Sequence, residues 1–291
     1  MVCLFENLNQ EEADILYLVL RSQGIFCRIK RKDNWFCIEG PEIHREAARD
    51  AVDAYLAENS MPSDEDAADT SFSADSFNLS GIWVSLMLLA VYVAVSRSGD
   101  PGSYSAVFGA ASGLILSGEG YRCVTAMLLH ADAAHLMGNM AGLVVFGGAV
   151  SGMTGTGAGW LLILGCGILG NWVNAMVHPP EHLSIGASTA VFGALGLLAA
   201  IRSMAAIRTG KGWRQVGVYL GAGAALLGLM GTSARSDIGA HLFGCLVGFG
   251  TGIGYAWLVR HPLGHRTQIF SGGLAVLVLV ISWMTGADSS G

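Results

Sequence analysis

The segment GASTAVFGALGLLAA, residues 186–200, decides the class of this protein. It is almost wholly apolar, as expected of a helix that crosses a lipid bilayer, which takes about 20 mostly apolar residues. Two hydroxyl side chains, Ser188 and Thr189, nevertheless stand near its start, just after Gly186. Polar groups inside an apolar span are costly, so they mark a candidate functional site. The segment therefore predicts a membrane protein with chemistry at one end of a span.

The composition of the whole chain agrees with this interpretation. The 291 residues are 52% hydrophobic and only 13% charged, against about 25% charged residues in an ordinary soluble domain. The net charge of −6 argues against nucleic acid as a partner. The cysteines show no CxxC pair and no zinc spacing, which argues against a disulfide scaffold. They are Cys3, Cys27, Cys37, Cys123, Cys166 and Cys245.

Charged residues concentrate at the N-terminus, where 16 of the 22 acidic residues precede residue 78. The pattern over residues 1–58 is strand, helix, two strands, helix, which predicts a small α+β domain. Residues 59–78 are rich in Ser, Asp and Ala and predict a solvated linker. No signal peptide precedes this domain, so we expect it to stay in the cytoplasm, with Cys27 and Cys37 as free thiols.

The remainder of the chain predicts a polytopic α-helical membrane protein. Apolar segments of suitable length occur at residues 80–97, 123–150, 158–177, 187–205, 216–233, 238–258 and 268–286. The first six form a core over 79–260, and the seventh lies in a C-terminal part over 261–291. Arginine and lysine concentrate in the fourth-to-fifth and sixth-to-seventh loops, which places the N-terminal domain inside. The expected location is a bacterial inner (plasma) membrane.

Polar residues recur at the outer ends of two other predicted spans. His135 and Asn139 lie four residues apart in the second span and therefore share a helix face. His241 opens the sixth span. Taken singly, each has a plain structural interpretation, such as a helix–helix hydrogen bond. Their coincidence with Ser188 at one depth predicts that they converge.

These residues are the parts of an acyl-transfer site. A serine hydroxyl such as that of Ser188 becomes a nucleophile when a base takes its proton, and His241 can be that base. His135, Asn139 and the Ser188 backbone N–H, at a helix N-terminus, can stabilise an oxyanion. Gly186 lets the chain approach closely before the nucleophile.

A triad would require an acid that orients His241. Asp237 lies one turn earlier, where capping of the sixth helix is the favoured interpretation. We therefore expect a Ser–His dyad rather than a triad.

Three motifs in this order resemble the rhomboid family of intramembrane serine proteases. The family's His-x4-His-x3-Asn, Gly-x-Ser and Ala-His-x2-Gly-x3-Gly signatures match, over roughly residues 80–260. The matching residues are His130, His135 and Asn139, then Gly186 and Ser188, then Ala240, His241, Gly244 and Gly248.

The resemblance implies a six-helix core whose water-filled cavity opens to the outside. It also implies cleavage of transmembrane protein substrates near the outer face. Phe192 matches the aromatic that packs on the catalytic histidine, and His130 a residue that hydrogen-bonds near the site. Gly193 and Gly196 would let the fourth and sixth spans approach. The family often has Trp-Arg in its first outer loop.

In this chain the pair is Tyr121-Arg122, and the loop, 98–121, looks short. Because the loop is short, the sequence does not decide whether a substrate enters laterally from the membrane. No cofactor and no metal are predicted.

Two alternatives stay open. The first is a catalytically silent relative that binds transmembrane clients. The second is a metal-handling protein using His130, His135 and His241, although neither HExxH nor a partnering carboxylate accompanies them. The sequence indicates neither the oligomeric state nor the role of the N-terminal domain.

Overall fold

The computed structural model describes most of the chain, in two compact units, Met1–Thr70 and Ser71–Gly291. The described residues are 1–32, 35–59, 78–208, 210, 213–214, 216–219, 221, 225, 237–259, 261 and 263–289. Most of the predicted linker and most of the predicted fifth span, 216–233, lie outside these residues. Each unit is considered by itself.

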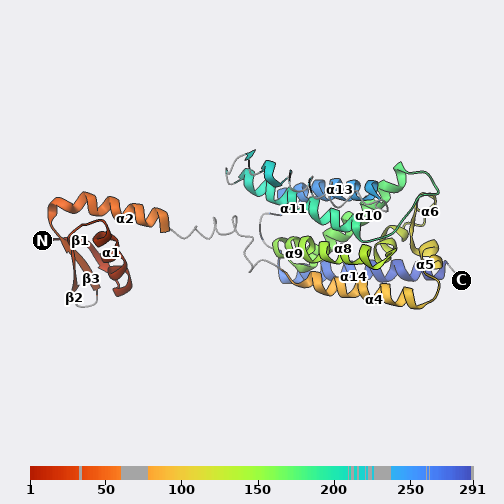
Figure 1. Ribbon diagram of the computed structural model, residues 1–291, viewed down its shortest axis with the longest axis horizontal. Helices are drawn as coiled ribbons and strands as arrows, with labels where there is room; N and C mark the ends of the chain where they lie inside the picture. Colours follow the sequence, from red (N-terminus) through yellow and green to blue (C-terminus); the bar gives the residue numbers. More distant parts are fainter. Residues whose placement is uncertain are drawn as a thin grey trace. The chain divides into compact units, whose positions relative to one another are not determined.

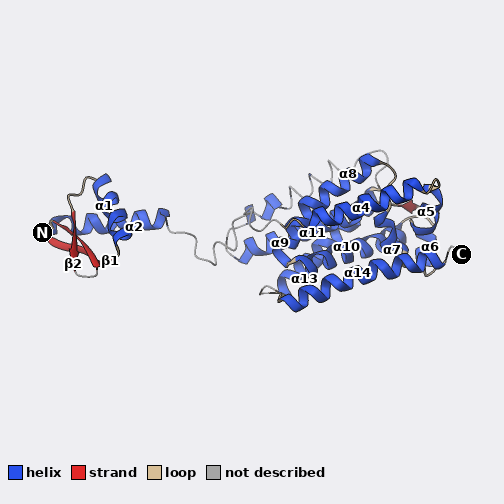
Figure 2. Cartoon of the chain, turned by 90° about the horizontal axis from the view of Figure 1, so that it is seen from below, coloured by secondary structure: helices blue, strands red, loops and turns tan. Residues whose placement is uncertain are grey.

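The N-terminal unit is an α+β fold with one three-stranded antiparallel sheet of order β1-β3-β2 (Figure 2). Its elements are β1 (Val2–Leu8), α1 (Gln10–Ser22), β2 (Arg28–Lys32), β3 (Trp35–Gly40) and α2 (Arg45–Asn59). Asn9 caps α1 in a reciprocal capping box with Glu12, which satisfies backbone donors at the helix start. The predicted order of strands and helices is confirmed.

The core of this unit lies between the sheet and the two helices, around Leu20, Ile38 and Val52. Cys27 and Cys37 are buried and are free thiols, as predicted. On the sheet, Glu39 pairs with Arg28 at 2.7 Å and with Lys30 at 2.8 Å. The basic strand β2 is therefore partly neutralised within the sheet.

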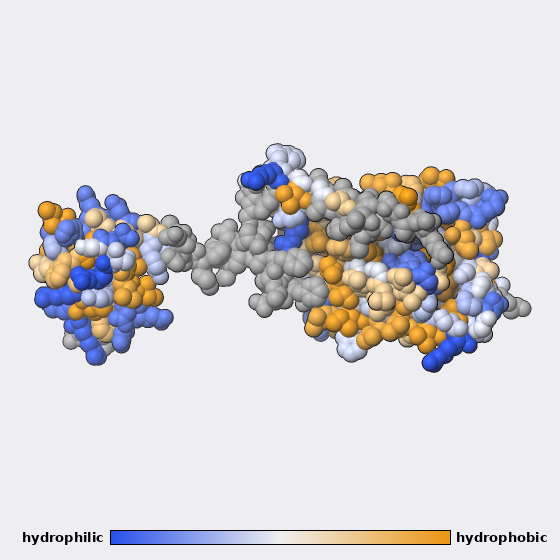
Figure 3. Space-filling view, viewed as in Figure 1, coloured by the Kyte–Doolittle hydropathy of each residue, from blue (hydrophilic) through white to orange (hydrophobic). Residues whose placement is uncertain are grey.

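The second unit is a bundle of long helices that run roughly along one axis (Figures 1 and 2). Among the described residues, six helical segments are long and apolar enough to cross a membrane. They are α4 (Ser80–Arg97), α8 to α9 (Ala133–Thr154), α10 (Thr156–Val177), α11 (Ser188–Arg208), α13 (Ile238–Leu258) and α14 (His265–Asp288). Hydrophobic side chains cover much of the visible bundle surface (Figure 3), as expected of helices that face lipid.

The predicted second span, 123–150, is long enough to include a non-spanning start, and the structure has one. Residues Arg122–Thr125 form a separate short helix, α7, and Ala126–Leu128 form a 3₁₀ turn. The spanning helix begins at Ala133 because Asp132 caps it, accepting a hydrogen bond from the His135 amide at 2.8 Å. Further along, Leu143–Gly147 is a π-helical turn between α8 and α9.

Glycine lets α11 and α13 pack closely. A Cβ atom on Gly196 would clash with the Cys245 carbonyl oxygen, and one on Gly248 would clash with the Gly193 carbonyl oxygen. Gly244 likewise lies against the backbone of Thr189. The predicted close approach of these two spans through small residues is therefore present.

The first loop is built from short elements that dock on the bundle. They are α5 (Pro101–Phe108), β4 (Ala110–Ala111) and α6 (Ser112–Leu116). Strand β4 pairs antiparallel with β5 (Leu183–Ser184), which lies just before α11. The loop thus contacts the segment that leads to Ser188.

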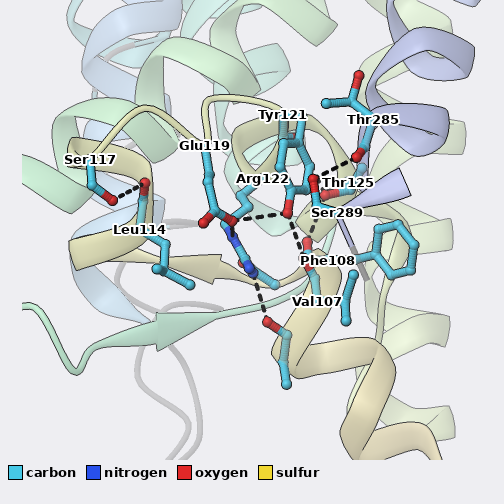
Figure 4. Close-up of polar contacts among 12 residues, drawn as sticks. Val107, Phe108, Leu114, Ser117, Glu119, Tyr121, Arg122, Thr125, Thr285 and Ser289 are labelled. Carbon is cyan, nitrogen blue, oxygen red and sulfur yellow. Dashed lines mark hydrogen bonds and ion pairs between the residues drawn. The ribbon is translucent and has the colours of Figure 1, made fainter. Parts of the chain in front are cut away.

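The Arg122 side chain links separate parts of this loop (Figure 4). Its side chain is buried and donates to Glu119 at 2.7 Å and to the carbonyl oxygens of Ala106 and Gly109 at 2.8 and 3.1 Å. The neighbouring Tyr121 hydroxyl donates to Glu119 at 3.0 Å. The Tyr-Arg pair therefore joins the end of α5 to the start of α7.

The last helix, α14, also packs on the first loop. The ring of Trp283 stacks on that of Phe108 with centroids 4.2 Å apart. Gly286 lies against Phe108 and Tyr121. Near the start of α14, Gln268 donates to the Thr154 carbonyl oxygen at 2.9 Å. In Figures 1 and 2 the end of α14 accordingly lies beside α5.

Candidate active site

The predicted nucleophile, Ser188, is the first residue of α11. The chain enters the helix through Gly186, whose φ of +125° disfavours any residue with a side chain. Because the first N–H groups of a helix have no partner within it, the start of α11 offers donors to an anion next to the hydroxyl.

The predicted base, His241, lies in the first turn of α13 and is only 4% exposed. Its ring stacks on Phe192, with centroids 4.4 Å apart and an angle of 29° between the planes. Phe192 lies one turn after Ser188 on α11, so both residues share a face of that helix. The imidazole is therefore held against the face that carries Ser188.

Within the described part of the chain, no hydrogen bond joins the Ser188 hydroxyl to His241, and His241 Nδ1 is buried without a partner. Hydrogen bonds between catalytic groups are often long before substrate binds. Among the described residues, no acidic side chain therefore forms a hydrogen bond with His241 Nδ1.

His135 and Asn139, on α8, reach the backbone just before Ser188. A Cβ on Gly186 would lie 2.6 Å from His135 Nε2 and 3.5 Å from Asn139 Nδ2. Asn139 is 5% exposed and its Nδ2 has no protein partner. A buried donor without a partner is costly, so this amide is a free donor facing the approach to Ser188.

His130 lies between the 3₁₀ turn and α8. Its Nε2 is the acceptor for the Ala187 amide at 3.4 Å. Its ring meets that of His135 edge to face, with centroids 5.2 Å apart. His130 thus touches both segments that carry the predicted oxyanion donors.

Asp237 caps α13, because its Oδ1 accepts from the Ala240 amide at 3.0 Å. Its Oδ2 lies 2.7 Å from His182 Nε2 and accepts from Asn174 Nδ2 at 2.8 Å. Burial raises the pKa of Asp237, but the Ala240 and His182 hydrogen bonds outweigh burial and leave the pKa below its usual value. The carboxylate therefore caps α13, as predicted, and among the described residues no hydrogen bond joins it to the His241 ring.

Sequence reasoning missed the polar residues of α10. Asn171 is 4% exposed, donates to the Cys123 carbonyl oxygen at 2.9 Å and accepts from Thr189 at 2.8 Å. This network fixes the residue directly after Ser188. Its signal was available, because an asparagine inside a long apolar segment is unusual.

A second missed group contains possible metal ligands. Among the described residues, His178, His182 and Asp237 form a cluster whose ligand atoms lie within 4.8 Å of one another. It is separate from the histidines of the metal-handling alternative, His130, His135 and His241. The cluster could not be recognised from spacing because Asp237 follows His182 by 55 residues.

The fold and this arrangement define a polytopic helical membrane protein with a serine, a histidine and amide donors gathered at the ends of three spans. Comparison with known proteins specifies the class. The Rhomboid domain family matches residues 117–258. The relative YdcA of Bacillus subtilis (strain 168) is 30% identical over 135 residues, which cover 46% of this chain and 67% of YdcA. The chain belongs to the rhomboid family.

Two other relatives are matched over a smaller share of their own length. The Bacillus subtilis (strain 168) protein named Rhomboid protease GluP is 35% identical over 119 residues, 40% of this chain and 23% of GluP. Rhomboid-like protein 11, chloroplastic, of Arabidopsis thaliana is 32% identical over 160 residues, 55% of this chain and 51% of that protein. The similarity thus centres on the helical unit and supports an integral membrane protein of protease type.

Proposed function

We propose that this protein is an intramembrane serine endopeptidase with a Ser188–His241 dyad, which cleaves transmembrane segments of membrane proteins near the outer face. The observation that carries the proposal is the stacking of His241 on Phe192, one turn from Ser188. The unpartnered Asn139 amide supports it, because an oxyanion site needs a donor that the resting protein does not use.

The steps follow from the residues. His241 takes the proton of the Ser188 hydroxyl as the oxygen attacks the scissile carbonyl carbon. The carbonyl oxygen becomes an oxyanion, which Asn139, His135 and the Ser188 amide stabilise by donating hydrogen bonds. His241 then gives its proton to the leaving amine, and an acyl-enzyme remains. Water, deprotonated by His241, hydrolyses this ester and restores Ser188.

The remaining roles are assigned by position. Gly186 has no side chain, which leaves room for the His135 ring. Phe192 orients the His241 ring. His130 supports the backbone of Ala187. A substrate helix must open before its peptide bond reaches the dyad. Residues with poor helix propensity near its outer end should therefore favour cleavage.

The test is cleavage of a transmembrane substrate by purified protein in detergent. Wild type is compared with Ser188→Ala, His241→Ala and the exposed-serine control Ser98→Ala, with a chelator lane for each. We expect cleavage only in wild type and Ser98→Ala, unaffected by chelator. Near-normal cleavage by Ser188→Ala, with melting temperatures matched, would overturn the dyad.

The client-binding alternative predicts a different result. A folded wild type that captures transmembrane helices but cleaves none of a varied panel would favour it. Loss of activity in chelator, with recovery on adding zinc, would instead favour the metal-handling alternative.

We also propose a topology. Residues 1–58 would lie in the cytoplasm of a bacterial cell, followed by the linker over 59–78, the core over 79–260 in the inner membrane, and the C-terminal span over 261–291. Leu18, exposed on α1, offers a labelling site. A Leu18→Cys variant should react with a membrane-impermeant maleimide only after lysis; labelling in intact spheroplasts would reverse the topology.

A further inference from the structure

We propose that His178, His182 and Asp237 form a binding site for a divalent zinc-type ion, between the end of α10 and the start of α13. The inference goes beyond the proposed protease and does not depend on it. Two imidazoles and one carboxylate are a common ligand set for Zn²⁺. Their ligand atoms lie within 4.8 Å of one another, while tetrahedral ligands at zinc bond lengths stand about 3.3 Å apart. Small side-chain rotations close this difference.

The tautomer of His178 suits metal binding. Its Nδ1 lies 3.0 Å from the Asn174 carbonyl oxygen. A carbonyl can only accept, so Nδ1 carries the proton and donates it. Nε2 is thereby left with a free lone pair. A ligating histidine ordinarily donates its other nitrogen to a carbonyl or carboxylate in this way.

His182 and Asp237 complete the set. The rings of His178 and His182 stack with centroids 4.1 Å apart, which aligns two imidazoles beside one carboxylate. His182 Nε2 and Asp237 Oδ2 are 2.7 Å apart, with side chains 24% and 14% exposed. A bound ion would replace the proton between these atoms. That proton passes to His182 Nδ1 or to solvent, while water fills the remaining coordination position.

Asn174 gives independent support for a ligand at this place. Its side chain is buried, with the residue 2% exposed, and its Oδ1 has no hydrogen-bond partner. A Cβ on Gly239 would lie 2.5 Å from both Asn174 Oδ1 and His178 Cε1, so the free oxygen lies beside the His178 ring. A buried acceptor without a partner is costly. A metal-bound water can donate to it.

The ligands are held by the backbone around them. His178 ends α10 and is followed by two prolines, Pro179 and Pro180, which restrict the turn. The His182 amide donates to the Pro179 carbonyl oxygen at 3.0 Å, and the Ser112 amide donates to the His182 carbonyl oxygen at 2.9 Å. A site preorganised in this way loses little conformational entropy on binding.

The ion would join the two segments that carry the proposed dyad. His182 stands six residues before Ser188, and the His241 amide donates to the Asp237 carbonyl oxygen at 3.1 Å. Binding would therefore stabilise the position of α13 relative to the segment before α11. The expected sign is a higher melting temperature in zinc.

The experiment uses the full chain, purified in detergent with a tag that lacks histidine. The protein is stripped with chelator, and Zn²⁺ is added while binding is followed by calorimetry and by melting temperature. We expect one ion per chain. His178→Asn and His182→Asn should each weaken binding by at least about tenfold. His265→Asn, at an exposed histidine on α14, and His135→Ala should bind as wild type does.

Wild type that fails to bind zinc saturably, or binding unchanged in both ligand variants, would overturn the proposal. A ligand variant that melts early even in chelator calls for a second measurement on wild type alone. X-ray absorption of zinc-loaded wild type should then show two imidazoles and oxygen ligands. Thiolate ligands, or no imidazole, would overturn the proposal.

Discussion

The imidazole of His241 lies face to face with the ring of Phe192, 4.4 Å between centroids. His241 Nδ1 is unpartnered among the described residues. In the proposed dyad, stacking would take the place of the orienting hydrogen bond that a carboxylate supplies in a triad. The aromatic ring therefore restrains the plane of the imidazole.

Replacing this ring should lower turnover more than stability. We expect Phe192→Leu to reduce kcat by roughly tenfold to a hundredfold, because a misplacement of about 1 Å costs that much in a positioned reaction. KM should change little. The measurement is steady-state cleavage with melting temperatures as a check. Phe243→Leu, two residues after His241, is the matched control. Equal kcat values in the two variants would show that the stacking is dispensable.

Gly186→Ala should be inactive and less stable. The positive φ costs about 1–3 kcal/mol for a residue with a side chain, and the new methyl would press on the His135 ring. Gly138→Ala is the matched control, since a Cβ there meets open space on the same helix as His135. Cleavage and melting temperature should fall for the first variant alone. An active Gly186→Ala would remove His135 from the proposed site.

Gly196→Ala should push α11 and α13 apart. Overpacking of a close helix contact typically costs about 1–3 kcal/mol, and the displaced α13 carries His241. Thermal unfolding in detergent should show the loss. Gly254→Ala, at a glycine of α13 where a Cβ would meet open space, should leave the melting temperature unchanged. Equal melting temperatures for the two variants would mean that α11 and α13 are less closely packed at Gly196 than described.

Arg122→Ala should destabilise the first loop. It removes the donor to two carbonyl oxygens, each costing about 1–3 kcal/mol when left buried without a partner. Arg122→Lys should restore only part of the loss, because one ammonium cannot reproduce the spread of a guanidinium. Limited proteolysis near residues 106–119 reports on the loop. Full rescue by lysine would mean that charge alone matters.

The N-terminal unit should lose stability in acid. Hydrogen bonds from Lys30 and Arg28 lower the pKa of Glu39 from 4.5 to about 2. A lowered pKa in the folded state stabilises the fold above the unfolded value, so this contribution is lost as pH falls from about 4.5 towards 2. A fluorotryptophan resonance of Trp35, on the same strand, can follow unfolding at each pH.

The matched variants separate this effect from general acid denaturation. Glu39→Gln should be less stable at neutral pH, and its stability should vary less between pH 4.5 and 2. Asp53→Asn, on the exposed side of α2, should behave as wild type. Equal acid sensitivity in all three proteins would contradict the role of Glu39.

Much of the fold could be predicted because apolar runs and polar interruptions are local properties. The spans around Ser188 and His241 and the α+β pattern at the N-terminus needed no knowledge of tertiary contacts. The residue at which the second span begins was harder to predict. Residues 122–128 are apolar enough to continue a helix, but Asp132 caps a new one, and only the cap distinguishes the two outcomes.

The polar network around Asp237 could not be predicted for a different reason. Asn174 and His182 reach it only after α10 and α13 have packed, and nothing in the spacing of 63 and 55 residues encodes that contact. The docking of Trp283 on Phe108 is another long-range result. The apolar pattern predicted a span over 268–286 but did not indicate which elements this span would contact.

The contact between Trp283 and Phe108 bears on how the protein is made. Phe108 is translated 175 residues before its partner, Trp283. The first loop therefore cannot reach its final packing until α14 is in place. Completion of the packing beside the Ser188 segment thus depends on a helix that is translated much later than the first loop.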